Sequence, residues 1–364
     1  MNVLTIGGAT LDMIIAYDNM ETMEIQRPEA TLSYLLLQEG AKIEVTSQQA
    51  FSGGGATNAA VSLKKLGLDV SFFGKVGNDY PGTVLLNELS DHGIDTQLVR
   101  YSKDYNTATS YVVPSLRGDR TIFAYRGANR HLLTEDLPQQ AIEWADFVYV
   151  TSLSQASAAR LPEIVNIAQQ NNTKVAINPG MSQLRAGKGF IKKALHGIDT
   201  LILNYEEAKQ LMFALMSTDE NRYTEHQLNH EENLLQSKPN YQEVSKNAFH
   251  LKSFFRQLLG LGPRIVVVTD GGNGVYVATD AKMYFHKAQP VDHIINTLGA
   301  GDAFGSTFSG AIYQGQSIEK AIQFGLVNSA SVIQHPDAKT GLLDLASIQA
   351  QVDALPALME VIDW

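Results

Sequence analysis

A short stretch near the C-terminus, "NTLGAGDAFG" at residues 296–305, places one acid directly after three small residues. Gly299, Ala300 and Gly301 leave room for the backbone to approach a ligand, and an apolar run with helical spacing follows them. The first N–H groups of such a helix point outward at the positive end of its dipole, where they can hold a phosphate. We expect an anion hole at this helix start.

Asp302 stands at the edge of the expected anion hole, where a bound phosphate would repel it. A carboxylate in that place can take the proton of a substrate hydroxyl while the hydroxyl oxygen attacks the phosphorus. Asp302 is therefore the candidate general base. The alternative is a purely structural one, because aspartate is also a favoured helix cap.

A second glycine-rich stretch, "SGGGATNAAVSLKKLG", begins at Ser52. Gly53 and Gly54 lead into an expected helix, and Asn58 lies one turn inside it, where its amide can bind a polyol. The stretch is neither a P-loop, because the GK[ST] ending is missing, nor a dinucleotide fingerprint. Asp12 follows the first expected strand and could accept hydrogen bonds from sugar hydroxyls. For the glycine-rich stretch, the alternative is a tight turn between a strand and a helix. For Asp12, the alternative is an acid that is solvated or caps a helix.

The elements that must position these residues alternate along the chain. Short apolar or β-branched runs predict strands near residues 3, 70, 147, 174, 200 and 264. Stretches with helical spacing lie between most of them. This alternation predicts an α/β fold of three layers, in which helices cover both faces of a mainly parallel, doubly wound sheet. Ligands of such sheets bind at the carboxyl ends of the strands.

Two segments break the alternation. Side chains at 107–127 alternate with a period of two around a Gly-Asp turn, which predicts an antiparallel hairpin, and 31–52 look like a strand pair joined around Glu39-Gly40. We assign both to a small β-strand lid over one end of the sheet, with an antiparallel edge of the main sheet as the alternative. The expected organisation is a single domain of residues 1–364, with lid segments at about 14–52 and 105–127 and a polar insertion at about 217–247.

The composition narrows the classes of partner. The 364 residues are 44% hydrophobic, enough for a large core, and carry a formal net charge of -10, which disfavours nucleic acid. The absence of cysteine excludes disulfides, thiolate nucleophiles and Cys-ligated zinc. No run approaches the roughly 20 apolar residues of a membrane span. We expect a cytoplasmic protein with no nucleic-acid or membrane partner.

In this order and spacing, the motifs resemble those of the ribokinase-like, or PfkB-type, carbohydrate kinases over nearly the whole chain apart from the polar insertion. "NTLGAGDAFG" is similar to the family's C-terminal signature, which implies Asp302 as the catalytic base and Gly299, Ala300 and Gly301 as the anion hole. "GGGATN" is similar to the N-terminal signature. The substrate-binding residues that the resemblance implies are Asp12, Gly53, Gly54 and Asn58.

Further elements of the resemblance imply a nucleotide site. "NYEEA" matches the family's N-x-x-E element, which implies that Glu207 organises Mg²⁺ through water. "TDGGNG" matches the nucleotide loop, and a late helix is expected to pack against the adenine. The nucleotide-binding residues that the resemblance implies are Asn204, Thr269, Gly271, Gly274 and Asn328.

Some positions depart from the family's pattern. Asn296 stands where many members carry an acid of a monovalent-cation site, and Asp337 stands where glycine is common, so a relocated carboxylate could restore that site. We expect a weak or altered dependence on K⁺. Position 55 is glycine rather than the lysine of many ribokinases, which disfavours ribose as the substrate.

The resemblance implies an ATP-dependent kinase that uses Mg²⁺ and phosphorylates a hydroxyl, expected to be primary, of a small sugar. A nucleoside kinase of the adenosine type is the alternative, and a non-catalytic sugar- or nucleotide-binding regulator is a third reading. The lid aromatic residues that could form a purine slot are Phe51, Tyr111, Phe123 and Tyr125. Exposed edges of the lid strands would permit a homodimer.

Overall fold

The computed structural model describes residues 1–18, 20–26, 31–114, 120–185, 188–216, 250–354 and 359–363. The polar insertion predicted at about 217–247 lies outside the described residues. Within the described ranges, none of the helices has the length and apolar character needed to cross a membrane.

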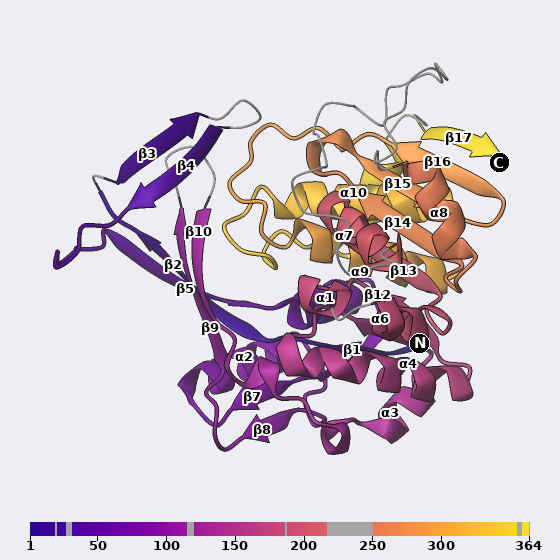
Figure 1. Ribbon diagram of the computed structural model, residues 1–364, viewed down its shortest axis with the longest axis horizontal. Helices are drawn as coiled ribbons and strands as arrows, with labels where there is room; N and C mark the ends of the chain where they lie inside the picture. The colour runs from indigo at the N-terminus through magenta and orange to yellow at the C-terminus, as the bar shows by residue number, and fades with distance from the viewer. Residues whose placement is uncertain are drawn as a thin grey trace.

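A nine-stranded sheet forms the centre of the molecule (Figure 1), in the order β17-β16-β15-β14-β13-β12-β11-β1-β6. The strands from β14 to β6 pair in parallel, whereas β15, β16 and β17 add an antiparallel edge. The predicted mainly parallel sheet is confirmed. The strands are β1 Asn2–Ile6, β6 Asp69–Phe73, β11 Phe147–Val150, β12 Lys174–Ile177, β13 Thr200–Asn204, β14 Ile265–Thr269, β15 Val275–Ala278, β16 Lys282–His286 and β17 Met359–Asp363.

Successive side chains of the central strands pack against two different helical layers, because they alternate across a strand. On β11, Phe147 and Tyr149 belong to one apolar cluster, and Val148 and Val150 belong to the other. Both sets are apolar because helices cover both faces of a parallel sheet. The predicted three layers are confirmed.

The helices divide between the two layers according to these clusters. One layer contains α1 Gly55–Lys65, α2 Tyr80–Asp91, α9 Ala300–Tyr313, α10 Ile318–Val332 and α11 Leu345–Asp353. The other contains α3 Gln139–Trp144, α4 Leu161–Gln170, α5 Met181–Leu184, α6 Lys188–Leu195, α7 Tyr205–Met216 and α8 Leu251–Leu259. Short 3₁₀ helices cover Gly127–Arg130, Thr134–Asp136, Gln155–Arg160 and Gly271–Asn273.

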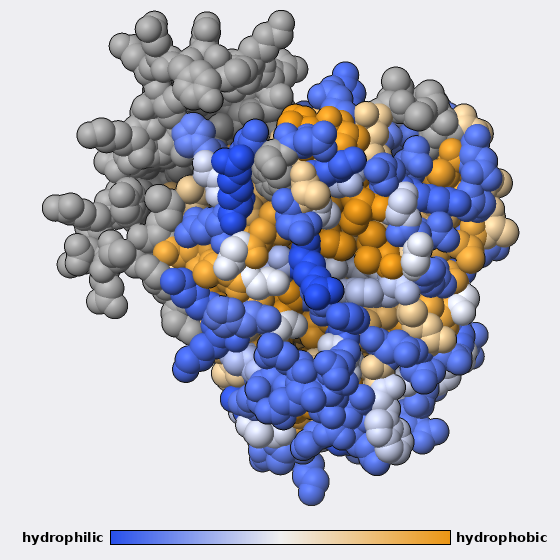
Figure 2. All heavy atoms as spheres, turned by 90° about the vertical axis from the view of Figure 1, so that its right-hand side faces the viewer, coloured by the Kyte–Doolittle hydropathy of each residue, from blue (hydrophilic) through white to orange (hydrophobic). Residues whose placement is uncertain are grey.

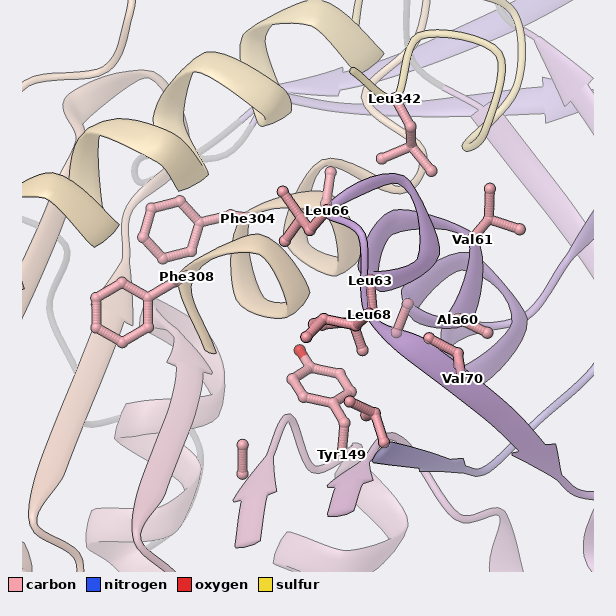
Figure 3. Packing of buried hydrophobic residues seen from close by; sticks show 14 of the residues in the cluster. Ala60, Val61, Leu63, Leu66, Leu68, Val70, Tyr149, Phe304, Phe308 and Leu342 are labelled. Carbon is pink, nitrogen blue, oxygen red and sulfur yellow. The ribbon is translucent and has the colours of Figure 1, made fainter. Parts of the chain in front are cut away.

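The first layer holds α9, the helix that carries the candidate base, against α1. Phe304 and Phe308 of α9 lie near Leu63 of α1 and near Leu66, which directly follows α1. The ring of Tyr149 points toward both helices from the sheet (Figure 3). Each of these five side chains is at most 2% exposed. Burying one side chain of this size stabilises the folded state by about 1.5–3 kcal/mol. The helix that carries Asp302 is therefore held in place by this apolar contact.

A separate four-stranded sheet, the lid, stands beside the main sheet (Figure 1), in the order β10-β9-β2-β5. Its strands β9 and β10 form an antiparallel hairpin, as the alternation at 107–127 predicts. The lid is therefore not an edge of the main sheet. Its strands are β2 Thr10–Ala16, β5 Ser47–Gly53, β9 Ala108–Pro114 and β10 Arg120–Tyr125.

The predicted strand pair within 31–52 is wrong in its pairing. β4 (Thr31–Leu36) pairs with β3 (Glu21–Gln26), while β5 pairs with β2. A period-two pattern identifies a strand but does not select its partner, so a nearby stretch of similar pattern can take its place. A further short pair joins β7 (Lys75–Gly77) and β8 (Arg100–Ser102).

The surface turned away from the lid differs from the core in its side chains. Hydrophilic side chains cover the lower part of this face, and apolar atoms lie between hydrophilic ones above (Figure 2). Apolar side chains exposed singly are normal on a folded protein.

Candidate active site

Asp302 lies in the first turn of α9 and does not cap the helix. The N-cap is Gly299, whose φ of 78° is left-handed, and no side chain caps this helix start. Asp302 Oδ2 instead accepts a hydrogen bond from Nδ2 of Asn58 at 2.8 Å. The capping alternative is therefore wrong, and the carboxylate faces the other glycine-rich helix start.

The helix start beside Asp302 is open on one side. A Cβ placed on Gly301 would meet no described atom within 4 Å, whereas one on Gly299 would lie 2.3 Å from the Cβ of Ala338. The first N–H groups of a helix lack partners within the helix. Together with the helix dipole, these groups can hold an anion next to Gly301.

The electrostatic environment of Asp302 suits a proton acceptor. Burial raises its pKa, the hydrogen bond from Asn58 and the positive charge of Lys339 lower it, and the negative charge of Asp12 raises it; the net shift is upward. A general base works best when its pKa lies near the operating pH. The raised pKa moves Asp302 in that direction.

Asp12 lies on β2 of the lid and is 9% exposed. Its Oδ1 accepts a hydrogen bond from the hydroxyl of Ser110 on the neighbouring strand β9. A Cβ on Gly53 would lie 2.0 Å from Asp12 Oδ2, so only glycine leaves room for this carboxylate. Burial raises the pKa of Asp12. A second carboxylate is thus held next to the glycine-rich turn.

Gly54 and Asn58 shape the start of α1. Gly54 has a φ of 100°, and a Cβ there would lie 2.4 Å from the carbonyl oxygen of Gly8. Asn58 is 5% exposed, and its Oδ1 has no hydrogen-bond partner among the described residues. Because an unpaired buried acceptor is costly, a ligand hydroxyl is a suitable donor for this oxygen.

The predicted nucleotide residues gather at the carboxyl ends of two neighbouring strands. Asn204 ends β13 and pairs in register with Thr269, which ends β14. Gly271 and Gly274 follow in a turn with φ of 51° and 123°. A Cβ on Gly274 would lie 2.2 Å from the carbonyl oxygen of His286. These residues therefore share one edge of the sheet.

Asn204 and Glu207 bind each other at the start of α7. The backbone N–H of Asn204 donates to Glu207 Oε2, and that of Glu207 donates to Asn204 Oδ1, each at 2.8 Å. This reciprocal pattern is a capping box. Burial raises the pKa of Glu207, and the negative charge of Asp302 adds to that effect against the Asn204 hydrogen bond. Two carboxylates thus act on each other at this edge.

Asn328, the remaining residue of the expected nucleotide site, lies on α10 rather than at this strand edge. Its side chain is fully buried in the layer of α9 and α10. Its Nδ2 donates to Thr307 Oγ1 at 2.7 Å, and its Oδ1 accepts from the backbone N–H of Leu343 at 2.9 Å. A contact with adenine would require this side chain to leave the core.

Most of the lid aromatic residues lie away from Asp12. Phe51 pairs directly with Asp12 and shares its face of the lid sheet. Tyr111 pairs with Met13, the residue after Asp12, and with Phe123 on β10. Tyr125 lies two residues after Phe123. Because side chains alternate across a strand, these three lie on the face opposite to Asp12. They are 46%, 51% and 50% exposed, respectively. Only Phe51 could therefore contribute to a slot beside Asp12.

Sequence reasoning missed two basic residues near the site. Arg120 on lid strand β10 donates through Nη1 to Thr297 Oγ1, in the loop before α9, at 2.9 Å. Lys339 is 4% exposed and lies 3.3 Å from Glu88 Oε1. Both contacts join residues far apart in the chain, so no local pattern signals them.

The sequence is similar to known proteins over most of its length. The sequence matches the pfkB family carbohydrate kinases over residues 12–345. It is 24% identical over 347 residues, 93% of this chain and 96% of the relative, to an ATP-dependent 6-phosphofructokinase of Thermoanaerobacterium thermosaccharolyticum. It is 26% identical over 324 residues, 89% of each chain, to an ATP-dependent ribose-1-phosphate kinase of Halopiger xanaduensis.

The fold is also similar to that of solved structures. An Arabidopsis thaliana ribokinase complexed with ribose and ATP superposes with a TM-score of 0.74. The superposition covers 96% of this chain and 98% of that chain, at 19% sequence identity. At this identity the likeness establishes the ribokinase fold.

Proposed function

The chain belongs to the pfkB family of carbohydrate kinases, and from this premise we propose that it transfers the terminal phosphoryl group of ATP to a primary hydroxyl of a small sugar. The observation that carries the proposal is the position of Asp302. Its carboxylate is oriented by Asn58 at 2.8 Å and lies in the first turn of a helix whose start is open beside Gly301. A base and an anion hole in one helical turn match phosphoryl transfer to an alcohol.

In the proposed reaction, Asp302 accepts the proton of the acceptor hydroxyl. The hydroxyl oxygen forms a bond to the terminal phosphorus, while the bond to the bridging oxygen breaks and its electron pair leaves with ADP. Backbone N–H groups at Gly299, Ala300 and Gly301 stabilise the charge on the transferred group. The proton then passes from Asp302 to solvent.

The acceptor would be held on the lid side of Asp302. Asp12 supplies carboxylate oxygens for sugar hydroxyls, and Asn58 Oδ1 is an acceptor without a described partner. Asn129 supports this arrangement, because its side chain bonds both the N–H and the carbonyl of Ala9 in the turn before Asp12, at 3.3 and 2.9 Å. The 3₁₀ helix that follows lid strand β10 is thereby joined to the turn between β1 and β2.

Mg²⁺ fits the oxygen donors at the nucleotide side. Mg²⁺ is commonly bound by one or two carboxylates, substrate phosphates and retained waters, and Glu207 lies close enough to Asp302 for their charges to act on each other. We propose that Glu207 organises the Mg²⁺ of Mg–ATP through water and that Asn204, Thr269, Gly271 and Gly274 surround the nucleotide. The ion would neutralise charge on the phosphates.

We also propose that the dependence of turnover on K⁺ is weak. Asn296 stands where other members would have the acid. Its Nδ2 donates to the carbonyl of Pro336 at 3.0 Å, and its Oδ1 accepts from the N–H of Leu298 at 2.8 Å. The amide thus joins the loop before α9 to the loop after α10. Asp337 is buried and accepts from the N–H of Thr340 at 3.1 Å. Similar rates in K⁺ and Na⁺ are expected in steady-state assays, and strong activation by K⁺ over Na⁺ would contradict this.

A homodimer through the lid is a further proposal. The face of the lid turned away from Asp12 exposes Tyr111, Phe123 and Tyr125 to about half of their full extent. Aromatic side chains gathered on a sheet face favour association with an apolar surface. Light scattering should give twice the chain mass, and a monomer at working concentration would exclude the dimer.

The function is tested with the purified full chain, Mg–ATP and separate acceptors. We would measure ADP release with ribose, ribose 1-phosphate, fructose 6-phosphate and adenosine, and identify the product by ³¹P NMR. Acceptor-dependent ADP release with a new phosphate ester on a sugar is expected. Preference for adenosine would favour the nucleoside alternative. ADP release unchanged by any acceptor would contradict the proposal.

A further inference from the structure

Lys339 is a buried cation that the proposed reaction does not use. Its side chain is 4% exposed, and its ammonium lies 3.3 Å from Oε1 of Glu88 on α2. It also donates to the hydroxyl of Ser52 on β5, and this hydroxyl in turn donates to Glu88. Lys339, Ser52 and Glu88 thus form a closed set of polar contacts.

This set connects both glycine-rich helix starts. Ser52 directly precedes Gly53, which contacts Asp12. On the other side, Ala338 directly precedes Lys339 and packs against Gly299 at the start of α9. Lys339 therefore joins the loop that supports the anion hole to the strand that supports the acceptor side.

The ammonium also acts on both carboxylates of the site. The positive charge of Lys339 lowers the pKa of Asp302 and of Asp12, in each case against a larger effect of burial. The charged groups facing Lys339 are Glu88 of α2, Asp337 of its own loop, Asp12 of β2, Asp302 of α9 and His92 at the end of α2. Those facing Asp302 are Lys339 and Asp12, with Glu207 and Tyr149 responding to its charge.

Stability alone does not explain such a group. Burying an ammonium carries a desolvation cost that an ion pair often only offsets, and a well-packed apolar pair in the same place is frequently as stable. A buried ion pair beside a site where carboxylates must be ionised has an electrostatic use as well. The contacts of Lys339 with both halves of the site fit that use.

We propose that Lys339 is a positioning residue of the phosphoryl transfer, which holds the loop under the anion hole against β5 and α2 and places a positive charge beside Asp302 and Asp12. It contacts neither reacting group. Its effect passes through Asp302, which must be ionised to accept a proton. The inference rests on the proposed function, because it takes Asp302 as the general base of the phosphoryl transfer.

The first test compares Lys339→Met with the wild-type chain. Without the ammonium, the acidic limb of the kcat/KM profile should move to higher pH. The loss should be roughly tenfold at pH values below the wild-type midpoint and should vanish well above both midpoints. The control is Lys65→Met. Lys65 of α1 also anchors this region, through the carbonyl of Leu342 at 2.5 Å, without acting on Asp302. An acidic limb that stays in place in Lys339→Met would overturn the proposal.

A second variant separates electrostatics from folding. Glu88→Leu combined with Lys339→Met removes both charges, so no unpaired Glu88 is left behind. The double variant should melt near the wild-type temperature and still show the displaced acidic limb. Recovery of the wild-type profile in the double variant would reduce Lys339 to a structural role and overturn the proposal. If Lys339→Met alone does not fold, the pH profile of the double variant tests the proposal.

A direct titration makes the result independent of turnover. The ¹³C signal of the Asp302 carboxyl, assigned by its loss in Asp302→Asn, is followed against pH in aspartate-labelled protein. Its midpoint should move upward in both Lys339 variants and stay in place in Lys65→Met. An unchanged midpoint overturns the inference. A wild-type chain without acceptor-dependent ADP release would instead contradict the proposed function, whatever the titration gives.

Discussion

The two glycine-rich helix starts at the site are built in opposite ways. At the start of α1, glycine is needed because other atoms are close: Gly53 lies against the carboxylate of Asp12, and Gly54 lies against the carbonyl of Gly8. At the start of α9, Gly299 is packed against Ala338, but Gly301 faces no described atom within 4 Å. The first start is filled from within the protein, whereas the second leaves space.

This difference suggests a division of labour between the two motifs. The filled start fixes Asp12 and Asn58, which can bind hydroxyl groups. The open start leaves N–H groups available to a phosphate. The hydrogen bond from Asn58 to Asp302 joins the two halves, at 2.8 Å, and places the base where an acceptor and a phosphoryl group would meet.

Removing the carboxylate from the open start should have the largest effect. Asp302→Asn keeps the shape of the side chain and an oxygen that can accept the hydrogen bond from Asn58. The amide cannot take a proton from the substrate hydroxyl. We expect kcat to fall about 10²- to 10⁴-fold with little change in ATP affinity by calorimetry. Asp344→Asn is the matched control, because Asp344 caps α11 by accepting from Ser347 N–H at 2.8 Å and does not act on Asp302. Wild-type turnover in Asp302→Asn would remove the base assignment.

The same variant should stabilise the fold at neutral pH. The pKa of Asp302 is raised in the folded chain, so its proton binds more tightly there than in the unfolded chain. The ionised carboxyl therefore disfavours the folded state once the pH exceeds both pKa values. We expect Asp302→Asn to raise Tm at pH 7.5 by about 1–3 °C, and to lose this advantage below the unfolded pKa. A lower Tm at pH 7.5 would contradict this account.

Adding a methyl group to the filled start tests its packing. Gly54→Ala would place a Cβ against the Gly8 carbonyl in a backbone conformation that strains alanine. We expect a loss of about 3 kcal/mol or more in the free energy of unfolding, measured in urea. Gly67→Ala provides the control, because Gly67 has a φ of 82° with no described atom near a Cβ. Equal losses in both variants would mean that close packing is unimportant.

Adding a methyl group to the open start should spare the fold and affect the reaction. Gly301→Ala introduces a Cβ with no described neighbour within 4 Å, so Tm should hardly change. If a phosphate binds there, a displacement of about 1 Å can reduce kcat/KM about 10- to 100-fold. Gly260→Ala at the end of α8, where a Cβ would have ordinary contacts, is the control. Full activity in Gly301→Ala would place the anion elsewhere.

The smallest expected effect concerns the link between the lid and the open start. Arg120→Gln removes the guanidinium that donates to Thr297 at 2.9 Å. Since this contact is exposed, we expect a fall in kcat/KM of only about three- to tenfold. Arg130 is an exposed arginine beyond the lid hairpin, so Arg130→Gln should leave kcat/KM unchanged. Equal effects of both variants would indicate a general charge effect.

The sequence predicts those parts of the molecule that depend on neighbours along the chain. Strands of a buried parallel sheet are continuously apolar, and helix starts combine glycine with polar residues within a few positions. The three layers and the α9 start follow from such local patterns. Asp302, Asn58 and Asp12 could be singled out because each follows a glycine-rich turn or a strand end.

Contacts between distant segments could not be predicted in this way. Lys339 and Ser52 are 287 residues apart, and β4 pairs with β3 rather than with β5. Asn328 shows the converse: its helix matches a family pattern, but tertiary packing buries its amide between Thr307 and Leu343. Partner choice depends on the folded whole, which no single stretch encodes.

The pH dependence of phosphoryl transfer tests the central claim most directly. Above the raised pKa of Asp302 the base is ionised, and kcat/KM should fall as the pH decreases through that pKa. The residual activity of Asp302→Asn should lack this acidic limb, since no carboxyl remains at that position to be protonated. An acidic limb retained unchanged in Asp302→Asn would contradict the assignment of Asp302 as the base.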